Sequence, residues 1–177
     1  MHCPRLNHFA RINYDGTISR CGHMVNAPKF PTFEAMENSN WLQDTTDHFK
    51  ANEWPSECTR CRETESIGQT SIRRFANAFH EQAIRENREY LVVGGVLDNV
   101  CNSACQSCNA EHSTKIGALS SSEYIRINNE PAFSNLPLDR IIQLDINGGE
   151  PSYSKNYRNI LQNLPPNLKT LRLNTNC

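Results

Sequence analysis

The sequence predicts an α/β protein in which a small cysteine-rich module precedes a parallel β-sheet. Four of the eight cysteines lie within the first 61 residues, and three more lie within residues 101–108. Apolar runs at 90–98 and 141–147 have the composition of buried parallel strands. A third, alternating segment at 168–177 follows a stretch with helical periodicity, which completes a β-α-β-α-β pattern.

Length and charge set limits on the function. A chain of 177 residues can form one large core or two small domains. Its formal net charge of −1 directs it neither to nucleic acid nor to an anionic membrane. The longest apolar run is too short to span a bilayer, and the N-terminus lacks the apolar segment of a signal peptide. We therefore expect a soluble, cytoplasmic protein with no membrane or nucleic-acid partner.

Residues 1–62 form the predicted cysteine-rich module. Apolar and polar residues alternate around Asp15-Gly16, which predicts a hairpin whose second strand leads to Cys21. Residues 33–49 have the spacing of one helix, and the Trp54-Pro55 pair ends that pattern before a C-x-x-C motif.

A charged stretch at 63–89 predicts one bridging helix between the two halves of the chain. Its apolar residues recur at helical spacing, at Ile72, Phe75, Phe79 and Ile84.

Residues 90–177 supply the predicted parallel sheet. The second strand, which starts at 141, ends in a Gly-Gly-Glu-Pro turn. The helix at 154–165 is expected to bury one apolar face, formed by Tyr157, Ile160, Leu161 and Leu164. Three parallel strands leave an open edge, so the sequence predicts an incomplete barrel.

The cysteine content favours metal chemistry over disulfides. Disulfide frameworks belong to secreted chains, whereas close cysteine spacings in a chain without a signal peptide indicate metal or iron–sulfur ligation. The last cysteine, Cys177, has no partner in either group and is expected to be a free thiol.

Cys101, Cys105 and Cys108 have the spacing C-x-x-x-C-x-x-C. A [4Fe–4S] cluster has four irons that each normally take one thiolate, so three cysteines leave one iron open. A catalytic zinc keeps one coordination position open in the same way. A zinc knuckle with His112 as the fourth ligand is the alternative.

This cysteine triplet, at the carboxyl end of a first strand, resembles that of the radical S-adenosylmethionine (radical SAM) enzymes. The resemblance implies that Cys101, Cys105 and Cys108 are catalytic and hold a [4Fe–4S] cluster. It implies that the open iron binds the amino and carboxylate groups of SAM, which is then cleaved reductively to a 5′-deoxyadenosyl radical. Ser107 departs from the pattern, because many members have an aromatic residue before the last cysteine.

The turn at the end of the second strand resembles the radical SAM segment that contacts the methionine amino group. The resemblance implies a cofactor-binding role for four residues of this turn: Gly148, Gly149, Glu150 and Pro151. The end of the third strand resembles the polar strand end that faces the ribose or the methionine carboxylate, here Asn174, Thr175 and Asn176. Ligands of parallel α/β folds bind at the carboxyl ends of strands, so we expect these segments and the triplet to meet.

Four further cysteines form a second set: Cys3, Cys21, Cys58 and Cys61. Four soft thiolates suit either a tetrahedral zinc or a complete [4Fe–4S] cluster, and spacing leaves both open. The order of hairpin, tryptophan-bearing helix and C-x-x-C resembles the auxiliary-cluster SPASM/twitch module. That resemblance implies a second [4Fe–4S] cluster, with zinc as the alternative, and nearby histidines leave a mixed Cys/His zinc site open: His2, His8 and His23.

The resemblance extends over the whole chain. It implies an auxiliary-cluster module at 1–62, a bridging helix at 63–89, and at 90–177 the N-terminal half of a radical SAM barrel, with about three of the six strands of this TIM-like fold. We therefore expect a radical SAM oxidoreductase, or the N-terminal portion of one. Its electron donor would be a flavodoxin or ferredoxin, and its substrate an unknown peptide, protein or small molecule. The alternative is a non-catalytic iron–sulfur or zinc protein that serves as an electron-transfer or interaction subunit.

Overall fold

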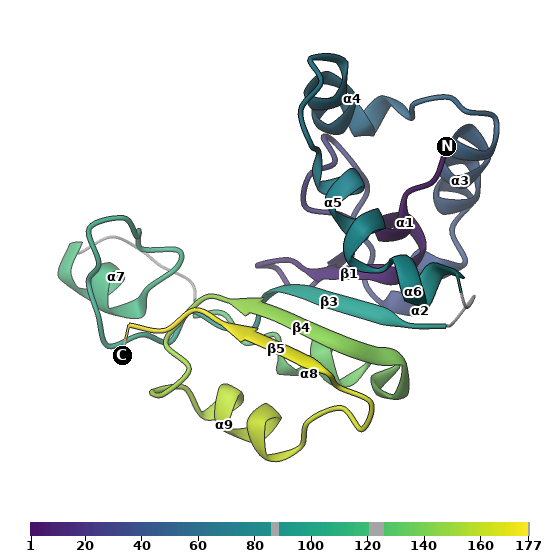
Figure 1. The fold of residues 1–177 in the computed structure, drawn as a ribbon. Helices are drawn as coiled ribbons and strands as arrows, with labels where there is room; N and C mark the ends of the chain where they lie inside the picture. The colour runs from purple at the N-terminus through teal and green to yellow at the C-terminus, as the bar shows by residue number, and fades with distance from the viewer. Residues whose placement is uncertain (86–88, 121–125, 177) are drawn as a thin grey trace. The chain divides into compact units, whose positions relative to one another are not determined.

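The fold is taken from a computed structural model that describes residues 1–85, 89–120 and 126–176. It is an α/β fold with a five-stranded, mostly parallel sheet (Figure 1). The strand order is β2-β1-β3-β4-β5. The strands are β1 (Phe9–Ile12), β2 (Ile18–Ser19), β3 (Leu91–Val96), β4 (Ile141–Asn147) and β5 (Thr170–Leu173).

The chain divides into two compact units. The first comprises Met1–Arg11 with Ile18–Leu91, and the second comprises Ile12–Thr17 with Val92–Cys177. The turn of the first hairpin therefore belongs to the second unit, although its strand β2 belongs to the first.

The predicted hairpin around Asp15-Gly16 is confirmed. The Asn13 N–H donates to the Thr17 carbonyl at 2.9 Å, and the Gly16 N–H donates to the Asn13 carbonyl at 3.1 Å. Gly16 has a φ of +77°, in the left-handed region that a tight turn requires. Cys21 follows the end of β2 after one intervening residue, as the pattern predicted.

The single helix predicted at 33–49 is wrong. The structure has α2 (Phe33–Glu37) and α3 (Asn40–Lys50) instead, after a short α1 (Pro4–His8). Ser39 separates α2 from α3, because its extended backbone starts a new helix and its hydroxyl accepts the Leu42 N–H at 3.2 Å.

The single bridging helix predicted at 63–89 is also wrong. A 3-10 turn, η1 (Ser56–Cys58), leads into α4 (Thr59–Ser66), which is followed by α5 (Ile72–Phe79) and α6 (Glu81–Arg85). Gly68, with a φ of +77°, follows the end of α4, and the Ser71 hydroxyl caps α5 by accepting the Arg74 N–H at 3.2 Å. Residues 86–88 of the expected helix lie outside the described residues.

The second unit contains the predicted alternation of strands and helices. Between β3 and β4 lie α7 (Thr114–Ser120), α8 (Glu130–Ser134) and the 3-10 turn η2 (Leu138–Arg140), and α9 (Lys155–Gln162) lies between β4 and β5. The two apolar runs form β3 and β4, whose side chains Leu91, Val93, Ile141 and Leu144 have no exposed surface.

Half of the predicted apolar face of α9 is buried. Tyr157 and Ile160 are 1% and 5% exposed, whereas Leu161 and Leu164 are 38% and 43% exposed. Leu164 lies beyond the last residue of α9, and Leu161 remains partly exposed although it lies one turn after the buried Tyr157. The prediction was therefore wrong for these two leucines.

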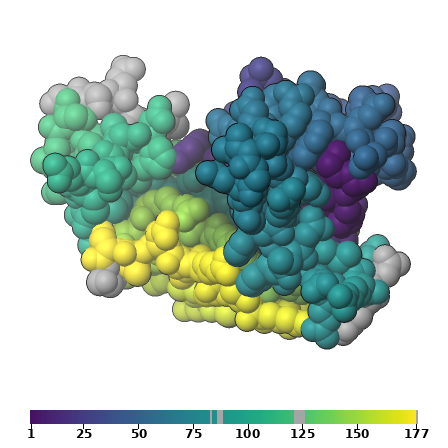
Figure 2. Space-filling model, turned by 45° about the horizontal axis from the view of Figure 1, so that its top comes forward, coloured from purple at the N-terminus to yellow at the C-terminus, as the bar shows by residue number. Residues whose placement is uncertain are grey.

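Strand β5 lies at the edge of the sheet. It pairs in parallel with β4, with Asp145 opposite Arg172 and Ile146 opposite Leu173. Figure 2 shows the C-terminal segment, in yellow, at the surface. Within the described residues, no helix is both long enough and apolar enough to span a bilayer.

Candidate functional site

Cys101, Cys105 and Cys108 lie on the loop that connects β3 with α7. The base of this loop is closed by Thr114, whose N–H donates to the Asn99 carbonyl at 2.9 Å. The Thr114 hydroxyl also accepts the Cys101 N–H at 3.1 Å. These two bonds fix the backbone at Cys101 relative to the end of β3.

The three thiols are accessible to solvent. Cys105 is exposed, Cys101 and Cys108 are half-buried, and all three are free thiols. A turn joins the last two, in which the Cys108 N–H donates to the Cys105 carbonyl at 3.0 Å. An incoming group can therefore reach the triplet from outside.

His112 uses both ring nitrogens within the protein. Its Nδ1 lies 2.6 Å from the Asn109 Oδ1, which can only accept, so Nδ1 carries the proton. Its Nε2 then accepts the Tyr14 hydroxyl, and the two rings meet edge to face at 4.8 Å. This arrangement gives His112 a structural role and opposes its use as the fourth ligand of a zinc knuckle.

The Gly-Gly turn packs tightly against the end of β3. Gly148 and Gly149 have φ values of +89° and +60°. A Cβ atom would lie 2.6 Å from the Asp98 carbonyl at the first glycine and 2.8 Å from the Val100 carbonyl at the second. The resemblance implied a cofactor-binding role for these glycines, and the structure shows that they allow a close approach of backbone to backbone.

Glu150 is buried and bonded on both carboxylate oxygens. It is 1% exposed. Oε1 accepts the Ser152 N–H at 3.0 Å, the Ser152 hydroxyl at 2.7 Å and the Thr175 hydroxyl at 2.8 Å, and Oε2 accepts the Asn176 N–H at 2.8 Å. Burial alone would raise the pKa of Glu150, but the donors on Asn176, Ser152 and Thr175 outweigh it and lower the pKa to about 2. The Glu150 side chain thus has a structural role, because its hydrogen bonds hold neighbouring segments together.

The structure brings together the segments that the resemblance assigned to SAM. The Asn176 amide nitrogen lies 3.9 Å from the Cys101 sulfur and 3.2 Å from the Asn102 Oδ1. The Asn174 amide donates to the Asn147 Oδ1 at 2.5 Å. The ends of β3, β4 and β5 thus meet at one edge of the sheet. Pro151 is buried next to the turn.

Two residues that the sequence reasoning missed connect this edge to α9. Asp98, which has no exposed surface, accepts the Ser154 hydroxyl with its Oδ2 and the Val100 N–H, at 3.1 Å, with its Oδ1. Burial raises the pKa of Asp98. Ser154 also caps α9 by accepting the Tyr157 N–H at 3.3 Å. The only local signal was an acidic residue directly after an apolar run.

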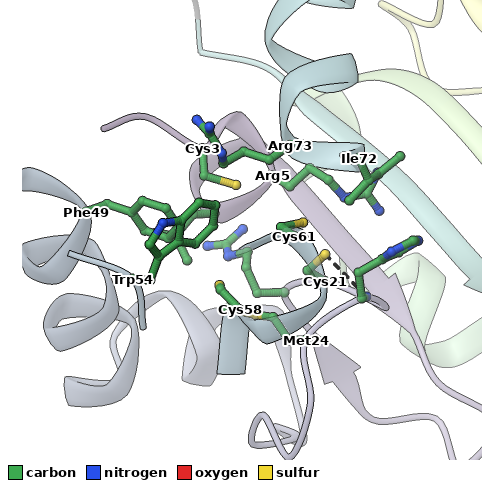
Figure 3. Close-up of a pocket in the computed structure, with 13 residues that line it drawn as sticks. Cys3, Arg5, Cys21, Met24, Phe49, Trp54, Cys58, Cys61, Ile72 and Arg73 are labelled. Atoms are coloured by element: carbon green, nitrogen blue, oxygen red, sulfur yellow. Dashed lines mark hydrogen bonds between the residues drawn. The ribbon is translucent and has the colours of Figure 1, made fainter. Parts of the chain in front are cut away.

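The second cysteine set surrounds one pocket in the first unit (Figure 3). Cys3 precedes α1, Cys21 follows β2, Cys58 ends η1 and Cys61 lies in α4. The empty space between these and the other lining residues is about 400 Å³, part of which is open solvent. Thiols from three separate stretches of the sequence therefore face a common space.

The four thiols also influence one another electrostatically. Burial, followed by the charges of Cys21 and Cys61, raises the pKa of Cys3 to about 12. Burial likewise raises the pKa of Cys58 to about 12, with contributions from the three other cysteines of the set.

The walls of this pocket are cationic and apolar. Arg5, Arg20 and Arg73 line it, and among its described lining residues none is Asp or Glu. Phe49, Trp54 and Met24 complete the walls. Arg73 and Arg20 are already paired with Glu65 and Glu37, so their positive charge is partly neutralised before any metal group binds. Of the three histidines considered for a mixed Cys/His site, the described lining includes His23.

The chemistry of both cysteine sets fits thiolate-bound metal groups. Within the described ranges, no three or more His, Cys, Asp or Glu side chains are gathered as a metal ion would require. A zinc ion with Zn–S bonds of about 2.3 Å brings its thiolates to within about 4 Å of one another. In a [4Fe–4S] cluster each thiolate binds a different iron, so the sulfur atoms stand farther apart. Loading either set with a single metal ion therefore requires the cysteine side chains to move.

Comparison with known proteins gives no match to a family model, to a curated protein or to a solved structure. The chemistry of the two cysteine sets and the convergence of three strand ends are therefore the basis for assigning a function.

Proposed function

We propose that this chain is a radical SAM enzyme, or the N-terminal portion of one. Cys101, Cys105 and Cys108 would hold a catalytic [4Fe–4S] cluster with one open iron. When bound, that cluster supplies the electron that cleaves SAM and starts radical chemistry on a substrate.

One observation carries this proposal: the cysteine loop, the glycine turn and the polar end of β5 meet at the carboxyl edge of the sheet. The Asn176 contact with the Cys101 sulfur, at 3.9 Å, joins the first and third of these segments. The 2.8 Å bond from the Asn176 N–H to Glu150 joins the third to the turn. Ligands of parallel α/β sheets bind at such an edge.

The residues of this edge would have distinct roles. The triplet supplies thiolates, and the exposed position of Cys105 leaves a path to the open iron. The turn would offer SAM the backbone polar groups of Gly148 and Gly149, since the Glu150 carboxylate is engaged by Ser152, Thr175 and Asn176. Asn174 and Thr175 are the polar side chains that would face the ribose or the methionine carboxylate.

The proposal includes an auxiliary cluster in the first unit. Four thiols line its pocket, which suits an iron–sulfur cluster bound by four thiolates. On this proposal residues 1–62 form a SPASM/twitch-like module, and the parallel strands belong to a partial TIM-like barrel. A flavodoxin or ferredoxin would deliver the electron.

The test compares wild-type protein with a Cys105→Ser variant, both reconstituted with iron and sulfide without oxygen. We expect the wild type to release 5′-deoxyadenosine from SAM in the presence of dithionite, and the variant to release none. Cys177→Ser is the matched control, because this cysteine belongs to neither set, and it should cleave SAM like the wild type. Undiminished cleavage by Cys105→Ser would refute the assignment of the triplet.

A second candidate function is a non-catalytic electron-transfer or interaction subunit. The four-thiol pocket favours it, because a fully ligated cluster or zinc needs no open position. This candidate predicts about four irons per chain, or about one zinc, and no cleavage of SAM. Metal analysis of the reconstituted wild type therefore separates the two functions.

A further inference from the structure

We infer that Asn176 raises the reduction potential of the cluster at Cys101, Cys105 and Cys108 by donating a hydrogen bond to the Cys101 sulfur. This inference rests on the proposed function, because it requires a cluster at the triplet. It adds a tuning role for Asn176 and a positioning role for Glu150.

The Asn176 amide has a partner for each of its two N–H bonds. One points to the Cys101 sulfur, with nitrogen and sulfur 3.9 Å apart, and the other to the Asn102 Oδ1 at 3.2 Å. The Asn102 contact orients the amide, because only the nitrogen of Asn176 can donate to an oxygen acceptor. The same nitrogen is thereby directed at the sulfur.

The backbone of this exposed segment is held by a buried group. The Asn176 N–H donates to the Glu150 Oε2 at 2.8 Å, and the neighbouring Thr175 hydroxyl donates to Oε1 at 2.8 Å. Glu150 in turn is anchored through its own N–H, which donates to the Val100 carbonyl at 2.8 Å. Val100 immediately precedes Cys101, so one carboxylate links both partners of the N–H···S contact.

Hydrogen bonding is uneven across the triplet. The Cys101 sulfur has a second donor, the Ser103 N–H at 3.4 Å, and also lies 3.6 Å from the Ser103 carbonyl oxygen. In the described chain, the Cys108 sulfur faces a carbonyl oxygen, that of Asn109 at 3.8 Å, which cannot donate. Donors to a cluster sulfur stabilise the added negative charge of the reduced state and so raise its potential. We therefore expect the hydrogen bonds at this edge of the sheet to raise the reduction potential mainly through the iron bound by Cys101.

The test is a redox titration of the full chain, reconstituted without oxygen and followed by electron paramagnetic resonance. Dithionite is the reductant, and the catalytic cluster is identified in a parallel sample as the signal that changes when SAM is added. We expect the midpoint potential of this cluster to fall in Asn176→Ala. It should fall further in Asn176→Asp, whose carboxylate would face the sulfur. Asn163→Ala, which removes an exposed amide after the end of α9, should leave it unchanged.

Glu150→Gln provides a second variant. It retains the Asn176 side chain but weakens the bond that holds its backbone, so the potential should shift in the same direction by a smaller amount. A merely structural role for Asn176 would change the iron content and leave the potential of the loaded cluster unaltered.

The outcomes separate the inference from the proposed function. A SAM-responsive signal with equal potentials in wild type and Asn176→Ala would overturn the inference and leave the proposed function standing. If no signal of the wild type responds to SAM, both are overturned, because the triplet then holds no catalytic cluster.

Discussion

The carboxylate of Glu150 accepts the backbone N–H of Asn176 at 2.8 Å across 26 residues of sequence. The bond joins the turn after β4 to the end of β5, and the Thr175 hydroxyl reinforces it at 2.8 Å. A charged acceptor with both oxygens bonded and 1% of its surface exposed stabilises the fold through charge-assisted hydrogen bonds. Its loss should therefore affect stability and its dependence on pH.

Replacement of Glu150 by Gln should lower the free energy of unfolding by about 2 kcal/mol at pH 7, since hydrogen bonds to a charged group each contribute about that much. The pKa of Glu150 is lowered in the folded protein, from 4.5 to about 2. The unfolded chain therefore takes up the proton first, so this contribution is complete above pH 4.5 and is lost as the pH falls towards 2.

Urea unfolding of the metal-free wild type and of Glu150→Gln, followed by circular dichroism, measures this difference. The difference between the two stabilities should shrink as the pH falls from 4.5 towards 2. Glu111→Gln, which changes an exposed carboxylate, should match the wild type throughout. A difference that stays constant down to pH 3 would show that the charge of Glu150 is not the cause.

Gly148→Ala should destabilise the protein by about 3 kcal/mol, through left-handed strain and a steric clash together. The φ of Gly148 is +89°, and a Cβ would lie 2.6 Å from the Asp98 carbonyl. Gly68→Ala is a matched control with a φ of +77° and no heavy atom within 4 Å of the added Cβ, and it should cost about 1 kcal/mol. Thermal unfolding measures both, and equal costs would contradict the tight packing of the turn.

Strands were predictable because their signal is continuous and local. The apolar runs that became β3 and β4 need no distant partner to be recognised, and the Asp15-Gly16 turn is similarly local. The ends of the helices were harder to predict from the sequence. Ser39 and Ser71 look like polar residues inside longer helical patterns, although in the structure each caps a new helix with its hydroxyl.

The meeting of three strand ends was also predictable, because carboxyl ends of parallel strands share one edge of a sheet. The side-chain pairs at that edge were not predictable from the sequence. The Asp98–Ser154 bond spans 56 residues, and the Tyr14–His112 bond spans 98. Local patterns carry no signal for a side-chain pair so distant in sequence, so the structural uses of Glu150 and His112 emerged only from the fold.

His112→Ala should retain the iron content of the wild type while lowering stability by about 1–2 kcal/mol, because the variant loses hydrogen bonds and no ligand. The bonds lost are those from the Tyr14 hydroxyl to Nε2 and from Nδ1 to Asn109. Iron analysis after anaerobic reconstitution and urea unfolding are the two measurements. His48→Ala, at an exposed position, is the control. Loss of metal in His112→Ala alone would restore the zinc-knuckle interpretation of the triplet.

The two cysteine sets should load with metal independently, because they belong to different compact units. Joint replacement of Cys58 and Cys61 by Ser should lower the iron content from about eight to about four per chain, since each cluster holds four irons. The paramagnetic signal that responds to SAM should persist, because its ligands lie at the edge of the sheet in the second unit. The complementary Cys105→Ser variant should lose that signal and retain iron at the four-thiol pocket. The contrary outcome is a Cys58/Cys61 variant that remains folded by circular dichroism but loses all its iron and the SAM-responsive signal. Loading of the triplet would then depend on the first unit, and the expected independence of the two sets would be wrong.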